Sequence, residues 1–298
     1  MSLVRQYGAK THVPVMPKEV LSHLNILKDG IYLDGTIGLG GHANMILSQL
    51  SPKGHLIGVD RDEEALRICK KSLSSSNSSI SLLNQSYHNI NSILDYLGIE
   101  KVNGILLDLG ISSLQLNSMD RGFSFNNDAS LDMRFDRSQK KTANHIINKT
   151  PEKILADILF YNGEEKRSRL IARNIVKMRP IEKVSELVEA VRRSTRPFKR
   201  NKSLSRVFQA IRIAVNDELE KLDIFLSAFY DRLSNEGRIV IISFHSLEDR
   251  KVKHSFKKLK IEKKFNILTR KPIIPTEKEM RKNSRSKSAK LRAAEKGE

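Results

Sequence analysis

Short apolar runs alternate with helical patterns over the first third of the chain. Ile31–Asp34, His55–Asp60 and Val102–Asp108 are apolar runs of strand length, and each ends on an aspartate. Ile80–Leu83 has the length of a further strand. Between these runs, apolar residues three or four positions apart predict helices, as over Asp62–Leu73. The alternation predicts a doubly wound α/β fold, a parallel sheet with helices between its strands.

The middle of the chain has a different periodicity. Residues 142–212 have the spacing of consecutive helices, with Gly163 as a stop signal and Ser185 as the expected cap of a later helix. Because strand patterns return afterwards, we expect residues 117–216 to form an inserted all-helical domain for substrate recognition.

Strand patterns return in the last quarter. Arg238–Phe244 predicts a further strand and Phe265–Leu268 a last one, whereas Asn283–Lys296 is basic, lacks a clear period and is expected to be mobile. Residues 1–116 and 217–298 are therefore expected to form one discontinuous sheet domain.

Composition excludes several classes of protein. The 298 residues contain no apolar run of membrane-spanning length, and the first residues lack the apolar core of a signal peptide. These features predict a cytoplasmic protein with no membrane partner. Cys69 is the single cysteine, which excludes an internal disulfide and a cysteine-rich zinc site. No metal site is predicted.

The net charge of +19 is concentrated in two segments. Residues 164–212 contain 15 basic and 5 acidic residues, and residues 249–298 contain 18 and 6. Basic charge gathered in this way indicates a polyanionic partner such as a nucleic acid. One reading left open is a non-catalytic RNA-binding protein, which would keep these segments without needing converging acids.

A glycine-rich loop follows the first predicted strand. It contains Gly35, Gly38, Gly40 and Gly41. A P-loop is excluded because no Gly-Lys-Ser/Thr follows, and the third glycine of a nicotinamide fingerprint is replaced by Ala43. A nicotinamide-dependent oxidoreductase nevertheless stays an alternative. Asp34, directly before the loop, suits an amine-bearing cationic ligand such as S-adenosylmethionine better than a pyrophosphate.

Three aspartates are expected to meet where the parallel strands end, because ligands bind such sheets at the carboxyl ends of the strands. Asp60 stands 19 residues after Gly41, a spacing typical of an acid that binds ribose hydroxyls. Asp34 would lie near the amino-acid end of the donor and Asp108 near its methyl group. Asp60 as a helix cap and Asp34 as a buried cap partner remain open alternatives.

Six sequence blocks resemble the bacterial MraW/RsmH methyltransferases, in the same order and over nearly the whole chain. They are Asp34-Gly-Thr-Ile-Gly-Leu-Gly-Gly-His42, Asp108-Leu-Gly-Ile-Ser-Ser-Leu-Gln115, Arg121-Gly-Phe-Ser-Phe125, Leu131-Asp-Met-Arg-Phe-Asp136, Phe208-Gln-Ala-Ile-Arg-Ile-Ala-Val-Asn216 and Ser243-Phe-His-Ser-Leu-Glu-Asp-Arg250. The resemblance implies a class I Rossmann-like S-adenosylmethionine methyltransferase sheet. It also implies methylation of the exocyclic N4 of a decoding-region cytidine in 16S ribosomal RNA, within the small ribosomal subunit.

The same resemblance implies which residues bind the cofactor. They are Gly40, Gly41, His42, Asp60, Tyr87, Asp108 and Gln115, with Gly38 and Asp34 added by the loop argument above. Tyr87 stands where the family often has phenylalanine, and either ring can pack against adenine. Leu114 stands where a proline is common, which changes the loop without removing a functional group.

The residues themselves favour nitrogen over carbon methylation. Methylating C5 of cytosine needs a cysteine nucleophile, and Cys69 lies on a predicted helix remote from the strand ends. Methylation of N4 needs the nitrogen, the methyl group and the sulfur to be aligned, and it needs a group that accepts a proton from N4. Asp108, Ser112 and Ser113 are the candidates, whereas His245 is either a base contact or a core or capping residue.

RNA contacts are expected from the basic insert and the basic tail, which would clamp phosphates around a base turned out of the RNA. Arg196, Lys199 and Arg200 are the candidate phosphate ligands of the insert. A homodimer is a candidate assembly.

Overall fold

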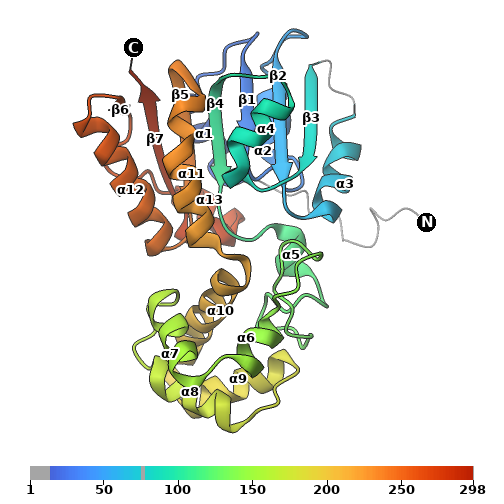
Figure 1. Cartoon of the computed structure of the whole chain (residues 1–298), viewed down its shortest axis with the longest axis vertical. Coiled ribbons are helices and arrows are strands. Elements are labelled where there is room, and N and C mark those ends of the chain that lie inside the picture. The colour runs from blue at the N-terminus through green and yellow to red at the C-terminus, as the bar shows by residue number, and fades with distance from the viewer. Residues whose placement is uncertain (1–13, 75–77, 298) are drawn as a thin grey trace. The chain divides into compact units, whose positions relative to one another are not determined.

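The computed structural model describes residues 14–74 and 78–297, and these form two compact units (Figure 1). One unit comprises the described residues up to Gly110 together with those from Leu222 onward, and the other runs from Ile111 to Lys221. The boundaries predicted from the sequence were 117 and 216. The role of the second unit in substrate recognition stays a prediction.

The described part of the first unit contains a seven-stranded sheet of order β3-β2-β1-β4-β5-β7-β6. Its strands are β1 (Ile31–Asp34), β2 (His55–Asp60), β3 (Ser79–Asn84), β4 (Val102–Asp108), β5 (Leu233–Ser243), β6 (Phe265–Ile267) and β7 (Lys290–Lys296). Strands β1 to β5 pair in parallel, and β7 runs antiparallel to both of its neighbours. The expected α/β class and parallel arrangement are confirmed.

Helices cover both faces of this sheet (Figure 1). They are α1 (Pro17–Leu24), α2 (Gly41–Leu47) and α3 (Glu63–Ser72) on one face, and α4 (Ile90–Tyr96), α11 (Glu218–Arg232) and α12 (Ser246–Ile261) on the other. Successive strand residues point to opposite faces, so Tyr32 packs in the core of α1 to α3 and Leu33 in that of α4, α11 and α12. Burial on both faces explains why these strands are continuously apolar.

The basic segment Asn283–Lys296 is ordered, so the expectation of a mobile tail is wrong. It follows α13 (Glu277–Lys282) and forms the 3₁₀ helix η4 (Ser284–Ser288) and strand β7. The Arg292 Nε donates to Asp249 Oδ1 at 2.6 Å, and the Lys296 Nζ donates to the Leu233 carbonyl at 2.8 Å. The charged residues of this strand therefore have partners that are distant in sequence. This is why the local sequence pattern did not indicate a strand here.

The second unit is helical. Its elements are α5 (Ser113–Asn117), α6 (Ala143–Lys149), α7 (Glu152–Tyr161), α8 (Ser168–Lys177), α9 (Val184–Arg193), the 3₁₀ helix η3 (Pro197–Lys199) and α10 (Arg200–Asn216). Helix α7 ends just before Gly163, as predicted. Ser185 does not cap α9: Lys183 is the N-cap, and the Ser185 N–H lies inside the helix and donates to Asp128 Oδ1 at 3.0 Å.

In the described ranges, no helix combines the length and the apolar character that crossing a membrane requires.

Candidate active site

The strand order reverses between β1 and β4, and ligands of open α/β sheets bind at such switch points. Asp34 is the last residue of β1 and Asp108 the last of β4, so the two carboxylates flank this point. The Asp108 backbone N–H donates to Thr36 Oγ1 at 2.7 Å, which ties the glycine loop to β4. Thr36 was not among the residues predicted from the sequence, although it stands in the loop two residues after Asp34.

Asp60, at the end of β2, fixes the other side of the loop. Its Oδ2 accepts the Gly38 N–H at 2.8 Å, and its Oδ1 accepts the Asp62 N–H at 2.9 Å. The cap of α3 is Asp62, not Asp60. Asp60 therefore shapes the loop, and its assignment to ribose stays a prediction.

Two glycines of the loop adopt left-handed backbone conformations. Gly38 has φ +51° and Gly40 has φ +85°, values that glycine tolerates without the steric cost of a Cβ. A Cβ on Gly40 would lie 3.0 Å from Cys69 Sγ, whereas a Cβ on Gly38 would meet only the Thr36 carbonyl, at 3.8 Å. Packing thus accounts for Gly40, and Gly38 borders open space that a ligand can occupy.

The buried His42 and the partly buried Asp108 lie close together beside the loop. The His42 Nε2 lies 3.6 Å from Asp108 Oδ2, longer than a hydrogen bond, and only 6% of His42 is exposed. Among the described residues, neither ring nitrogen of His42 nor Asp108 Oδ1 has a hydrogen-bond partner. Buried polar atoms normally have partners, so the pair fits a polar ligand.

Burial changes the acidity of the nearby groups. It raises the pKa of Asp34 to about 7, an effect that His42 opposes and that the negative charges of Asp108 and Asp60 increase. Burial also raises the pKa of Asp60 to about 6, against the hydrogen bonds it accepts. A cation bound here would favour the ionised carboxylates. The cluster therefore suits the positively charged sulfonium and amine of S-adenosylmethionine.

The raised pKa of Asp34 predicts a pH-dependent stability. An unfolded aspartate titrates near pH 4, so between about pH 4 and 7 the folded protein binds more protons, and the free energy of unfolding falls as pH rises. Asp34→Asn removes the titrating group and with it this loss of stability. The asparagine keeps a side-chain oxygen that can accept the Thr36 N–H, as Asp34 Oδ1 does. The variant's melting temperature relative to the native protein should rise from pH 4 to 7 and then level off. A difference independent of pH, as expected for the exposed control Asp29→Asn, would contradict this.

Burial also raises the pKa of the Cys69 thiol, to about 12. A nucleophilic cysteine requires a thiolate, so the structure agrees with the sequence argument against a covalent route through Cys69.

Tyr87 begins the 3₁₀ helix η2 (Tyr87–Asn89) that follows β3. Its half-buried ring meets Phe225 edge-on, with ring centroids 5.5 Å apart. A Cβ on Gly35 would lie 2.9 Å from the Tyr87 Cβ, so Tyr87 also packs against the glycine loop. Its contact with adenine stays a prediction.

Three of the predicted catalytic and cofactor-binding residues, Ser112, Ser113 and Gln115, belong to the second unit and have structural roles there. Ser112 is the N-cap of α5: its Oγ accepts the Gln115 N–H at 3.2 Å, and Gln115 Oε1 accepts the Ser112 N–H at 3.0 Å. Ser113 is the first residue of the helix. This capping box accounts for the buried Gln115, and the catalytic and cofactor roles of these residues stay predictions.

His245 is the N-cap of α12. Its Nδ1 accepts the Glu248 N–H at 3.4 Å, and its Nε2 lies 3.2 Å from Glu248 Oε1. Glu248 Oε2 also accepts the Phe244 N–H at 2.9 Å. The structure thus gives His245 the capping role left open above, and its contact with a base stays a prediction.

Residues 9–297 match the model of the MraW methylase family. The chain belongs to this family. It is 49% identical over 296 residues to the ribosomal RNA small subunit methyltransferase H of Thermosipho africanus, covering 98% of this chain and 99% of that protein. The protein of the same name from Kosmotoga olearia is 46% identical over 296 residues, with the same coverage. The resemblance and the enzyme class, a methyltransferase, are confirmed.

Among solved structures, an rRNA methylase from Streptococcus thermophilus aligns with 97% of this chain and 100% of its own. It has a TM-score of 0.46 and 12% identity, a distant likeness.

The family blocks of the second unit hold one another in place. Arg121 is 1% exposed, and its Nη2 donates to the Arg134 carbonyl at 2.7 Å. Asn216 Oδ1 accepts the Phe135 N–H at 2.8 Å, and its Nδ2 donates to the Met133 carbonyl at 2.7 Å. These contacts give a structural role to residues of the family blocks to which the sequence alone assigned none. They build an irregular loop that periodicity could not reveal.

The residues predicted to bind RNA lie where α10 begins. Arg196 and Lys199 are exposed at η3, and Arg200 is half-buried with no partner for its Nε among the described residues. Between them, Phe198 is 74% exposed, with the Lys199 Nζ 5.3 Å from its ring centroid. Basic groups around an exposed ring suit a nucleic acid, and the RNA contact itself stays a prediction.

Proposed function

We propose that this member of the MraW methylase family transfers a methyl group from S-adenosylmethionine to N4 of a decoding-region cytidine in 16S ribosomal RNA. The observation that carries the proposal is the cluster of Asp34, Asp60 and Asp108 at the ends of three parallel strands, with His42 beside them. The names of the relatives support ribosomal RNA of the small subunit as the substrate.

S-adenosylmethionine, when bound, supplies a methyl group on a good leaving group. The chain's own residues bind and orient it: Asp60 accepts hydrogen bonds from the ribose hydroxyls, and Asp34 faces the amino-acid end. Tyr87 packs against the adenine. A Cβ on Gly38 would meet almost no protein atom, so the space beside this residue is open to a ligand. Because glycine has no Cβ, the backbone here can approach the ligand closely.

The acceptor nitrogen has to be aligned with the methyl group and must lose a proton. Asp108 is the proposed acceptor of that proton because its Oδ1 is buried without a partner among the described residues. Ser112, Ser113 and His245 remain candidates for positioning the base. The inert Cys69 thiol favours nitrogen over C5 as the site of methylation.

The second unit is proposed to recognise the RNA through Arg196, Lys199 and Arg200. Replacing all three with glutamine should weaken binding to small-subunit RNA and flatten its salt dependence, because each phosphate contact adds about 0.7–0.9 to the log–log slope. Filter binding over a series of salt concentrations measures this.

The matched control removes three exposed lysines of the same unit, Lys140, Lys149 and Lys153, by the same substitution. If both triple variants lose affinity equally, or if neither does, the three residues are not a specific clamp.

Mass spectrometry of small-subunit RNA tests the whole proposal. RNA from cells lacking this protein should lack one methyl group on a decoding-region cytidine, and the purified protein should restore it. Calorimetric titration with S-adenosylmethionine and with a nicotinamide nucleotide separates the oxidoreductase alternative, which predicts binding of the second ligand only.

We also propose that the enzyme acts in the cytoplasm, where its ribosomal substrate is assembled, and that two copies associate. Phe160 and Tyr161, 49% and 67% exposed, provide apolar surface that such association can cover. Light scattering of the purified protein measures the assembly.

A further inference from the structure

The basic segment at the end of the chain divides into buried and exposed residues. The basic residues of strand β7 have partners within the protein. The Arg292 guanidinium binds Asp249, and the Lys296 Nζ lies 4.2 Å from the Tyr230 ring centroid. These residues are not available to a partner. Exposed lysines and arginines occur along much of the rest of the segment, and five of them lie on the single helix α12: Arg250, Lys253, Lys257, Lys258 and Lys260.

Helix α12 has one face in the core and one in solvent. Val252 and Phe256 are 1% and 2% exposed and pack against the sheet. One position further along, Lys253, Lys257 and Lys260 are all exposed at helical spacing. We call these three residues the lysine stripe.

The stripe differs from an ordinary solvated helix face. From Arg250 to Ile261 the helix has six lysines and arginines and no acid. Like charges three or four positions apart destabilise a helix, and no described residue forms an ion pair or hydrogen bond with the stripe.

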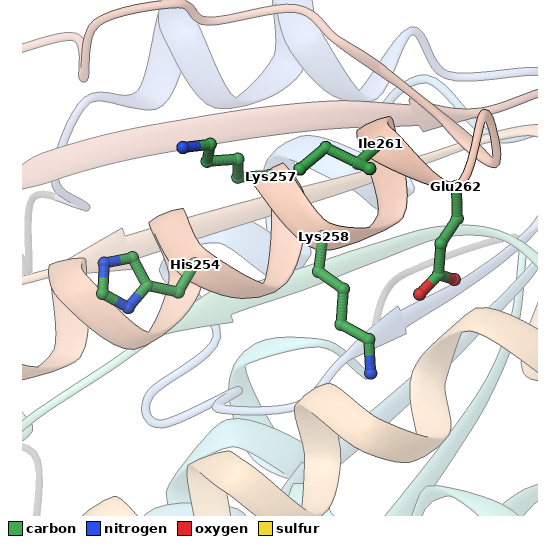
Figure 2. Close-up of a pocket in the computed structure, with 5 residues that line it drawn as sticks. All are labelled: His254, Lys257, Lys258, Ile261 and Glu262. Atoms are coloured by element: carbon green, nitrogen blue, oxygen red, sulfur yellow. The ribbon is translucent and has the colours of Figure 1, made fainter.

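A shallow depression of about 330 Å³ adjoins the stripe, and all of its lining residues lie on α12 or at its C-cap (Figure 2). They are His254, Lys257, Lys258, Ile261 and Glu262. Glu262, the one acid among them, is already paired with Lys264 at 2.9 Å. The surface thus presents uncompensated positive charge to any partner.

We propose that the lysine stripe binds the phosphate backbone of the substrate RNA, as a contact on the methyltransferase unit in addition to the insert. The inference rests on the proposed function for its RNA partner. Lysines act as flexible point charges that suit phosphates without reading sequence. A membrane surface is disfavoured because the apolar face of α12 is already buried in the core.

The test is the variant Lys253→Gln, Lys257→Gln, Lys260→Gln, assayed on small ribosomal subunits from cells that lack this methyltransferase. The slope of log affinity against log salt should become shallower by about 2 to 3, the loss of three phosphate contacts at about 0.7–0.9 each. The matched control replaces Lys18, Lys28 and Lys53, three exposed lysines of the same unit, and removes the same net charge. Its slope should change much less.

Equal changes in both variants, or a native slope in the stripe variant, would overturn the proposal. Methylation of the same subunits by the native protein is measured in parallel. If the native protein methylates them while the stripe variant binds normally, only the stripe is rejected. If the native protein transfers no methyl group, the proposed function itself fails.

Discussion

Asp108→Asn should lower kcat for methylation of small-subunit RNA by a factor of about 100 to 10,000, the range that general acid–base groups contribute. The amide keeps the size of the side chain but cannot accept the N4 proton as a carboxylate does. The Asp108 backbone N–H, which donates to Thr36, is unaffected by the substitution. The KM for RNA should change little, because the interaction is needed in the transition state. Single-turnover methylation with labelled donor measures the effect.

The control for this experiment is Asp29→Asn, which removes an exposed carboxylate from the same unit. It should methylate at the native rate. An Asp108→Asn enzyme with undiminished kcat would show that another group accepts the proton, and Ser112, Ser113 and His245 would then be tested in turn.

Asp60→Asn should raise the Kd for S-adenosylmethionine by about 10- to 150-fold. Hydrogen bonds to a charged group contribute about 1.5–3 kcal/mol, and each 1.4 kcal/mol is a factor of ten in affinity. Part of this loss of affinity is expected from a change in the glycine loop, because Asp60 Oδ2 accepts the Gly38 N–H. Calorimetric titration without RNA separates this effect from catalysis.

Asp62→Asn is the neighbouring control, since an asparagine still caps α3 as Asp62 does now. Cofactor affinity should stay at the native level in this variant. An Asp60→Asn protein that binds the donor as tightly as the native protein would remove Asp60 from the proposed ribose site.

The main features of the sheet were predictable because buried parallel strands are apolar throughout. Asp34, Asp60 and Asp108 end such runs, and the structure places each of them at a strand end. Strand β7 was not predictable, because its charged residues have partners far away in sequence, such as Asp249 for Arg292.

The candidate site was predictable in its acids but not in its internal bonds. The pairing of Asp60 with Gly38, and of Thr36 with the Asp108 N–H, depends on the loop's path between two strands. Ser185 shows the same limit for helices: a serine in a plausible cap position lies within α9, and the chain enters that helix at Lys183.

The place of β7 in the sheet has a consequence for how the protein is made. β7 is the last of the described strands to be synthesised, yet it lies between β5 and β6, and β6 pairs with it alone. A growing chain therefore leaves the edge of β5 unpaired until Lys290–Lys296 has emerged, and open strand edges invite aggregation. Nascent chains stopped before β7 are expected to depend on chaperones, whereas the helical insert, complete much earlier, is free to fold first.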